Sequence, residues 1–265
     1  MNTQPIVTIS DLTVKYGDKT VLYDVSTNVP RSEIRVILGS SGCGKTTLLK
    51  SIIGLIKPYS GTVTLFGTVM GDPDSPETGE LLKKIGVLFQ NGALLGSLTV
   101  AENLALPLQM HTGLSQDIID EIVQLKLTQV DLPHAGELFP GELSGGMRKR
   151  AALARALVLD PPLIFCDEPS AGLDPVTSAG LDELLLKLRD ILGITIVVVT
   201  HELLSIEKIS DSIIFLHKGH VLFDGLFEDA RKLESGPIRD FFDRKESREA
   251  DSESNNTASF TVESK

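Results

Sequence analysis

The stretch Gly39–Thr47 reads GSSGCGKTT and directly follows an apolar run that ends at Leu38. The spacing Gly39-x4-Gly44-Lys45-Thr46 is that of a phosphate-binding loop, whose required context is a strand before it and a helix after it. In such a loop, glycines let backbone N–H groups converge on phosphate oxygens, and the helix N-terminus favours negative charge. A chance glycine-rich turn is the alternative, but the flanking patterns disfavour it. An α/β fold built around a nucleotide is therefore expected.

The overall composition fits one such domain and excludes other classes. With 265 residues and 42% hydrophobic residues, the chain can bury a sizeable core. A formal net charge of -11 argues against a nucleic-acid partner held by a general basic face. The two cysteines, Cys43 and Cys166, are too few for a disulfide framework and indicate free thiols in a reducing compartment. No signal peptide is visible and no apolar run approaches the ~18 residues of a membrane span, so membrane association is expected through a partner.

Hydrophobic periodicity predicts alternating strands and helices with a helical insertion. Strands are expected within 6–38 (the last being Glu33–Leu38) and at Ser60–Phe66, Ile85–Phe89, Leu163–Cys166, Ile194–Thr200 and, as a hairpin, 212–225. Helices are expected at Lys45–Ile56, Thr99–Met110, Ser115–Leu127, Met147–Leu159, Pro175–Leu192, 226–234 and 236–243, with a polar turn at 71–79. These elements predict a mostly parallel sheet core, an N-terminal antiparallel β subdomain and a helical subdomain near 91–160. Residues 1–245 would form this nucleotide-binding domain, and the acidic tail 246–265 is predicted to be disordered in the isolated chain.

Acidic residues follow the apolar strand pattern LIFC at 163–166. Asp167 is placed to hold a Mg²⁺ shell together with the Thr46 hydroxyl, while Lys45 reaches the β- and γ-phosphates. Glu168 is the candidate that orients or deprotonates the attacking water. The alternative is that both acids lie in a solvated turn at the end of the strand.

Three single residues are weaker candidates, each with a structural alternative. His201 ends the strand pattern after the one that leads to Asp167, and carboxyl ends of parallel strands carry ligand chemistry; otherwise it is a satisfied structural histidine. Gln90 follows the strand IGVLF and otherwise belongs to an ordinary turn. Tyr16 precedes a glycine turn and either stacks on a base or only packs. Cys43 lies inside the loop and is interpreted as structural.

A second anion-binding helix start is predicted at LSGGM, residues 143–147. Ser144, Gly145 and Gly146 precede a helix expected to start near Met147, so they present N–H groups and a hydroxyl to an anion. Because residues 39–47 already supply one phosphate site, this start would serve the nucleotide of another molecule. A simple N-cap by Ser144 is the alternative.

Along the chain the motifs come in the order Tyr16, GSSGCGKTT, Gln90, LSGGM, LIFCDEP, SAGLD and His201. This order resembles that of the nucleotide-binding subunit of an ABC (ATP-binding cassette) transporter over about residues 6–244, with a P-loop NTPase core. The resemblance implies ATP and Mg²⁺ as cofactors, a head-to-tail homodimer, and an integral membrane permease as partner at the cytoplasmic face of the inner membrane. Tyr16 would stack on adenine, Gln90 would contact Mg²⁺ and water, and His201 would grip the γ-phosphate. Ser144, Gly145 and Gly146 would bind the nucleotide of the other subunit, and Asp174 in SAGLD would bridge the dimer. The implied catalytic residues are Lys45, Gln90, Glu168 and His201; the metal ligands Thr46, Gln90 and Asp167; and the nucleotide contacts Tyr16, Gly39, Ser40, Ser41, Gly42, Cys43, Gly44, Lys45, Thr46, Thr47, Ser144, Gly145, Gly146 and Asp174.

Two departures from the common pattern resemble the ATPases of MCE-type, Mla-like lipid transporters. Met147 stands where the family usually has Gln, and the segment after Gln90 reads NGALLGSLTVAENLALPL; GPIRDFF at 236–242 fits as well. This implies phospholipid transport in a bacterial envelope, with MCE-domain and STAS-domain proteins as candidate further subunits. Ala93, Leu94, Leu95 and Leu98 are expected to line a groove for a permease helix, or alternatively to pack within the fold.

Other functions remain open from the sequence. A transporter of another solute, a lipoprotein or an amino acid would share these motifs. A soluble ABC ATPase of DNA repair or translation usually has two cassettes, coiled-coil insertions or zinc cysteines, and these 265 residues show none. A phosphate-loop kinase gives no reason for LSGGM.

Overall fold

The computed structural model describes residues 4–72 and 74–243. The strands are β1 (Val7–Tyr16), β2 (Lys19–Val29), β3 (Ile34–Gly39), β4 (Ser60–Leu65), β5 (Thr68–Val69), β6 (Ile85–Leu88), β7 (Leu163–Asp167), β8 (Thr195–Val199), β9 (Ser212–His217) and β10 (His220–Leu226). The helices are α1 (Lys45–Ile52), α2 (Pro76–Leu82), α3 (Val100–His111), α4 (Gln116–Gln129), the 3-10 helix η1 (Pro140–Glu142), α5 (Gly145–Leu157), α6 (Pro175–Leu192), α7 (Leu203–Ile209) and α8 (Phe227–Arg231). Residues 237–243 are helical as well.

A six-stranded sheet with the order β10-β9-β3-β8-β7-β6 forms the centre of the molecule. All neighbouring strands in it are parallel except β10 and β9. β3, β7 and β8 are buried along their whole length, which explains their continuous apolar sequences. The carboxyl ends of five parallel strands therefore meet at one edge, where ligands bind in open α/β sheets.

Alternate residues of these strands point into two separate cores. Ile164 and Cys166 of β7 belong to a core shared with α3–α7, whereas Phe165 belongs to a core shared with α1, β1 and β2. The two-residue period of a strand makes this division. The sheet is thus covered on both faces, and its edge is left for the site.

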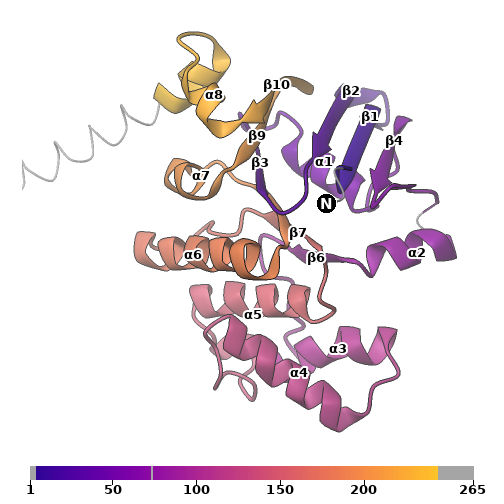
Figure 1. Cartoon of the computed structure of the whole chain (residues 1–265), viewed down its shortest axis with the longest axis vertical. Coiled ribbons are helices and arrows are strands. Elements are labelled where there is room, and N and C mark those ends of the chain that lie inside the picture. Colours follow the sequence, from indigo (N-terminus) through magenta and orange to yellow (C-terminus); the bar gives the residue numbers. More distant parts are fainter. Residues whose placement is uncertain (1–3, 73, 244–265) are drawn as a thin grey trace, which may run out of the picture.

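An antiparallel sheet with the order β2-β1-β4-β5 packs beside α1 at the opposite side of the molecule from α3, α4 and α5 (Figure 1). The helices α3, α4 and α5 contact one another at the lower end of that view. Lys126 of α4 is 2% exposed and its Nζ lies 2.5 Å from Asp160 Oδ1, which follows α5. This ion pair fastens the outer helix to the core side of the helical region.

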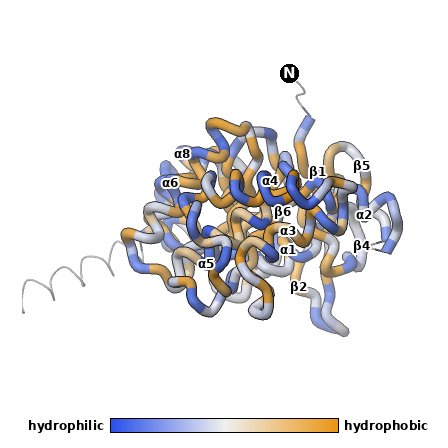
Figure 2. The backbone as a smooth tube through the Cα atoms, turned by 90° about the horizontal axis from the view of Figure 1, so that it is seen from below, coloured by the Kyte–Doolittle hydropathy of each residue, from blue (hydrophilic) through white to orange (hydrophobic). Residues whose placement is uncertain are grey.

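Hydrophobic and hydrophilic residues succeed one another along the helices, as the orange and blue segments of the tube show (Figure 2). Such amphipathic helices bury one face against the sheet and leave the other to solvent. Within residues 4–72 and 74–243, no helix combines the length and hydrophobicity needed to cross a bilayer.

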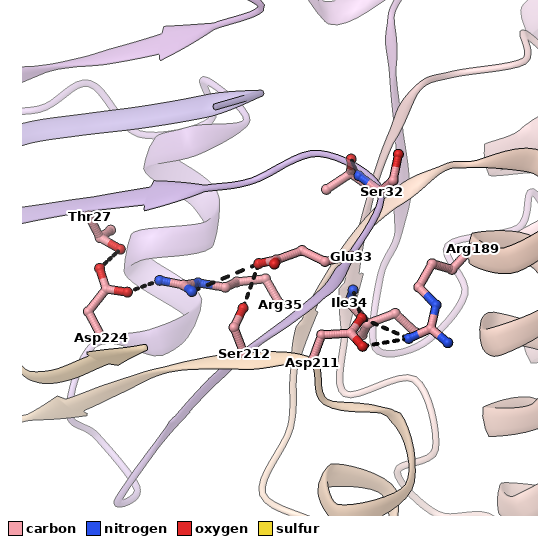
Figure 3. Close-up of polar contacts among 10 residues, drawn as sticks. Thr27, Ser32, Glu33, Ile34, Arg35, Arg189, Asp211, Ser212 and Asp224 are labelled. Atoms are coloured by element: carbon pink, nitrogen blue, oxygen red, sulfur yellow. Dashed lines mark hydrogen bonds and ion pairs between the residues drawn. The ribbon is translucent and has the colours of Figure 1, made fainter. Parts of the chain in front are cut away.

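A partly buried polar network anchors β3 at the end remote from the phosphate loop (Figure 3). Arg35, 4% exposed, donates to Asp224 of β10, which also accepts from the Thr27 hydroxyl of β2. Asp211 accepts from the Ile34 N–H at 2.7 Å and from Arg189 of α6 at 2.8 Å. These bonds join both sheets and a helix to β3, so the strand that leads into the loop is held firmly.

The predicted element types are confirmed for every predicted strand, for the hairpin and for the long helices, but four local predictions were wrong. α1 ends at Ile52 rather than Ile56, because Gly54 adopts φ +77° just after it. The expected polar turn at 71–79 contains the start of α2, where the Ser75 hydroxyl accepts from the Thr78 N–H. α7 was not predicted, because it is short and begins soon after β8 ends at Val199. α5 begins at Gly145 rather than near Met147. The tail 246–265 lies outside the described residues.

Candidate nucleotide-binding site

The loop between β3 and α1 can be built only with glycine at two positions. Gly39 has φ +143°, and a Cβ there would lie 2.1 Å from the Leu216 carbonyl oxygen of β9. Gly44 has φ +109°, and a Cβ would lie 2.6 Å from Leu22. Gly44 is also the N-cap of α1 and has no side chain to occupy the first N–H groups. The backbone donors at this helix start are therefore available to an anion.

The side chains of this loop point in two directions. Lys45 Nζ donates to the carbonyl oxygens of Gly39 at 2.9 Å and Ser40 at 3.2 Å, so its ammonium lies over the loop. Cys43 is 4% exposed, and burial, the largest influence, raises the pKa of its thiol. The placement of Cys43 agrees with the structural interpretation.

Asp167 is the last residue of β7 and Glu168 follows it, and the two residues differ in burial. Asp167 is 7% exposed, and burial followed by the neighbouring Glu168 charge raises the pKa of its carboxyl. Glu168 has φ +46°, a left-handed conformation, and its N–H donates to the Val199 carbonyl at 2.8 Å. The left-handed conformation of Glu168 places the carboxylates of Asp167 and Glu168 in different surroundings.

Glu168 and His201 meet at the carboxyl edge of the sheet. Glu168 Oε1 lies 2.8 Å from His201 Nδ1, and the imidazole side chain is 63% exposed. The second oxygen, Glu168 Oε2, is buried and has no hydrogen-bond partner in the described chain. The histidine thus holds one carboxylate oxygen, while the other is buried without a hydrogen-bond partner among the described residues.

These residues surround a cavity of about 780 Å³. Its walls are Gly39, Ser40, Ser41, Gly42, Lys45, Thr46, Gln90, Glu168, His201, Phe215, His217, Pro237, Asp240 and Phe241. The first nine were candidates from the sequence. Cys43, Gly44, Thr47 and Asp167 lie in the same loop or strand end behind these walls, and Tyr16, 51% exposed, lies outside them.

The oxygen donors near the loop fit a divalent cation of the magnesium type. Asp167 Oδ1 is a buried carboxylate oxygen without a hydrogen-bond partner in the described chain, which is costly unless something binds it. Thr46 and Gln90 supply a hydroxyl and an amide from the cavity wall. Magnesium prefers a few oxygen ligands of this kind together with water and phosphate.

The second group of candidates lies away from this cavity at two helix starts. Ser144 is the N-cap of α5, and its hydroxyl accepts from the Met147 N–H at 3.2 Å, so the N-cap alternative describes its contact here. Asp174 is the N-cap of α6 and accepts from the Val176 and Thr177 N–H groups, both at 3.1 Å. A Cβ on Gly146 would lie 2.3 Å from Thr177, so the two helix starts adjoin.

Sequence reasoning missed two features of the site. Phe215, His217, Pro237, Asp240 and Phe241 line the cavity, although GPIRDFF had been considered only as a family likeness. Lys149 of α5 is 6% exposed and its Nζ reaches the carbonyl oxygens of both Gln90 and Glu168. A lysine on the buried face of an amphipathic helix was the available signal.

A glycine-rich loop between strand and helix, with an acidic pair at the end of a nearby strand, defines a phosphate-loop nucleotide-binding protein. The family model described as "ABC transporter" matches residues 22–171. The probable ribonucleotide transport ATP-binding protein mkl of Mycobacterium tuberculosis is 40% identical over 235 residues, 89% of this chain and 66% of that protein. The chain therefore spans slightly less than two thirds of that relative's length. The chain belongs to the ABC transporter family of ATP-binding proteins.

Two further relatives agree with this family. The intermembrane phospholipid transport system ATP-binding protein MlaF of Escherichia coli is 38% identical over 241 residues, 90% of this chain and 88% of that protein. The solved dimer of the ATP-binding cassette MJ0796, bound to ADP and Pi, superposes with a TM-score of 0.76 at 33% identity, over 83% of this chain and 98% of that one. ADP and Pi are the products of ATP hydrolysis, the chemistry of this class.

Proposed function

We propose that this chain binds MgATP in the cavity beside the phosphate loop and hydrolyses it to drive a membrane permease that moves phospholipids or other lipids. The observation that carries the hydrolytic part is the Glu168–His201 contact of 2.8 Å at the rim of that cavity. It supports a carboxylate held in place beside the position where a γ-phosphate would lie.

In the proposed site, the loop 39–47 holds the phosphates with its backbone N–H groups, and Lys45 leaves the Gly39 and Ser40 carbonyls to bind the β- and γ-phosphates. Tyr16 stacks on the adenine. Thr46, Gln90 and Asp167 hold Mg²⁺, which supplies charge neutralisation to the phosphate oxygens. Burial, followed by the Glu168 charge, raises the pKa of Asp167, and a bound cation would favour its charged form.

Hydrolysis needs a positioned water, and Glu168 supplies the acceptor. Glu168 lines the cavity, and its Oε2, which is buried without a partner in the described chain, is the oxygen that would accept a hydrogen bond from the attacking water once bound nucleotide brings a water to it. His201 orients Glu168 through Nδ1 and presents its other nitrogen to the γ-phosphate. Catalysis is mostly electrostatic positioning, because a phosphoryl group in transfer carries spread negative charge.

The complete site in this proposal contains a second subunit. Ser144, Gly145 and Gly146 at the start of α5 are not among the walls of the chain's own cavity, and the solved MJ0796 relative is a dimer. A head-to-tail homodimer would bring each α5 start onto the partner's nucleotide, with Asp174 at the contact. ATP binding would close the dimer and hydrolysis would reopen it.

The lipid cargo rests on the relatives. The MlaF protein of Escherichia coli matches along 88% of its length, whereas the mycobacterial ribonucleotide-transport relative matches along 66%. The fuller match favours a phospholipid transporter, at the cytoplasmic face of the inner membrane, with MCE-domain and STAS-domain subunits as further partners. Transport of another solute is the second candidate and rests on the mycobacterial name.

In this proposal, the permease contacts the exposed part of residues 93–98. Leu95 is 46% exposed, while Leu94 is half-buried and packs against the large core. The packing alternative therefore describes Leu94 in this structure, and Leu95 is the better probe of an interface.

The test is to isolate the chain with its membrane partner and to measure ATP hydrolysis and bound lipid. Glu168→Gln should keep nucleotide binding and slow turnover by at least about 100-fold, because the acceptor for the water is lost. Near-normal hydrolysis by this variant would exclude Glu168 from the role. Recovery of a partner that carries a non-lipid solute would favour the second candidate.

A further inference from the structure

α5 contains a lysine whose charge lies inside the protein next to the candidate site. Lys149 is 6% exposed, and its Nζ lies 2.5 Å from the Gln90 carbonyl oxygen and 3.0 Å from the Glu168 carbonyl oxygen. Gln90 follows β6 and Glu168 follows β7, which are neighbouring strands. One ammonium thus joins the ends of two strands through main-chain oxygens.

The Glu168 end of this contact is a strained turn. Glu168 adopts φ +46°, which is unfavourable for a residue with a Cβ and must be held by its surroundings. Its N–H is held by Val199 of β8, and its carbonyl accepts from Lys149 at 3.0 Å and from the Ala171 N–H at 3.2 Å. The conformation that aims the Glu168 carboxylate at His201 is therefore fixed from both sides of the peptide.

The Gln90 end is held by a second cation of the same helix. Arg155 donates to the Ala93 carbonyl at 2.7 Å and to the Gly92 carbonyl at 3.0 Å. Residues 90–93 are thus fastened to α5 at two points, although they belong to the loop after β6. Any movement of α5 would be passed to this loop.

The first residue before the same helix is Ser144, its N-cap. Lys149 lies five positions further on, about 7.5 Å along the helix axis. α5 therefore carries both contacts on one helix. Its start holds the candidate contact to the partner's nucleotide, and Lys149, about one and a half turns later, contacts Gln90 and Glu168.

Stability alone does not explain a lysine at this place. Burial lowers the pKa of Lys149, while the nearby Glu168 and Asp167 carboxylates raise it. An apolar residue would avoid the desolvation of a charge, and replacing buried charges by apolar residues is often neutral or stabilising. The ammonium of Lys149 donates hydrogen bonds to two main-chain carbonyl oxygens, which an apolar residue could not do.

We propose that Lys149 is a positioning residue that couples the start of α5 to the Gln90 loop and to Glu168, so that engagement of the partner's nucleotide sets the geometry of hydrolysis in the chain's own site. This inference rests on the proposed ATPase function. It assigns Lys149 no contact with nucleotide, and the phosphate loop shares no hydrogen bond with it.

The experiment is Lys149→Met in the full chain, which keeps the length of the side chain and removes its donors. We expect kcat to fall at least about 10-fold, because misplacing a catalytic group by a small distance is costly. The Kd for a non-hydrolysable ATP analogue should stay within about threefold, since uniform binding is untouched. Unchanged kcat, or a loss of kcat matched by an equal loss of analogue affinity, would overturn the proposal.

Lys126→Met is the matched control. Lys126 is also a buried lysine with a contact of 2.5 Å, but its partner Asp160 lies in the helical region away from the cavity. This variant should lower the melting temperature and leave kcat within about twofold. An equal fall of kcat in both variants would mean that Lys149 acts only through general stability.

Two further variants separate the possible failures. Lys149→Arg keeps the charge and several donors and should recover at least about a third of wild-type kcat. If Lys149→Met does not fold, Arg155→Met releases the Gly92 and Ala93 carbonyls alone and should still lower kcat by about threefold with analogue binding kept. Full activity of that variant would overturn the coupling. A wild-type chain that binds the analogue and never hydrolyses ATP would instead refute the proposed function.

Discussion

Three helix starts in this protein carry candidate site residues and satisfy their first N–H groups in different ways. α1 begins after Gly44, which offers no side chain to its N–H groups. α5 begins after Ser144, whose neutral hydroxyl accepts from Met147. α6 begins after Asp174, whose carboxylate accepts from two N–H groups and from the Thr177 hydroxyl. All three first turns lack acidic residues.

A helix start suits a phosphate best when no cap occupies its first N–H groups. The three starts therefore differ in how well they suit an anion, according to what caps each of them. An anion is attracted to the free N–H groups and to the positive end of the helix dipole. At α6 the protein's own carboxylate already fills that role. At α5 the hydroxyl caps without charge, so the start remains suited to an anion from another subunit. At α1 nothing competes with the nucleotide.

The largest expected effect is at α1. Gly39→Ala would push a Cβ to 2.1 Å from the Leu216 carbonyl and distort the loop that leads to this helix. Affinity for an ATP analogue should fall at least about 100-fold, since losing two charge-assisted hydrogen bonds costs about 3 kcal/mol or more. Fluorescence titration measures the loss. Gly141→Ala, where a Cβ has open space, is the control and should bind as the wild type does.

At α5 the expected effect is on hydrolysis and leaves nucleotide binding unchanged. Ser144→Arg should bind the analogue normally as a monomer but hydrolyse ATP at least about 10-fold more slowly, because its bulk and charge obstruct the composite site. Ser144→Ala removes the cap and should cost only about 1 kcal/mol of stability. Mixing Ser144→Arg with Lys45→Ala should restore at most one functional site per mixed dimer. Full-rate hydrolysis by a strictly monomeric protein would refute the shared site.

The smallest effect is expected at α6. Hydrogen bonds from the Thr177 side chain and backbone lower the pKa of Asp174. The stability that this carboxylate contributes is present above its unfolded pKa of about 3.9 and is lost as the pH falls through the lower folded value. Asp174→Asn, also a good cap, should match the wild type at pH 7 and show a weaker loss of stability below about pH 4. Thermal melts measure the melting temperature of both proteins across this pH range. If the charge has no such role, the two melting temperatures will change with pH in the same way.

Much of the fold and part of the candidate site could be predicted from local patterns. Lys45 and Thr46 follow from a motif of fixed spacing, because backbone geometry in nine residues builds that loop. Glu168 and His201 were expected at neighbouring strand ends, and the structure places them 2.8 Å apart although 33 positions separate them. Parallel strands make this possible, since their carboxyl ends share one edge.

Other features could not be predicted because they depend on which surfaces meet. α2 was hidden in a polar stretch, and its cap at Ser75 became clear only with the local geometry. The buried position of Lys149 could be suspected from the helix pattern, but its partners could not, since they are the carbonyls of residues 59 and 19 positions away. Leu94 could equally have been exposed or packed until the helical region was placed against the core.

The sequence by itself determined the phosphate loop, the buried parallel strands and the family, because each depends on residue types at short, regular spacing. The tertiary structure alone decided how the helix starts are capped, which oxygens of Asp167 and Glu168 lack partners, and that α5 holds the loop after β6. The reason is physical: strand and loop conformations follow from local sterics and periodicity, whereas burial and hydrogen-bond partnership are properties of packed surfaces from distant parts of the chain.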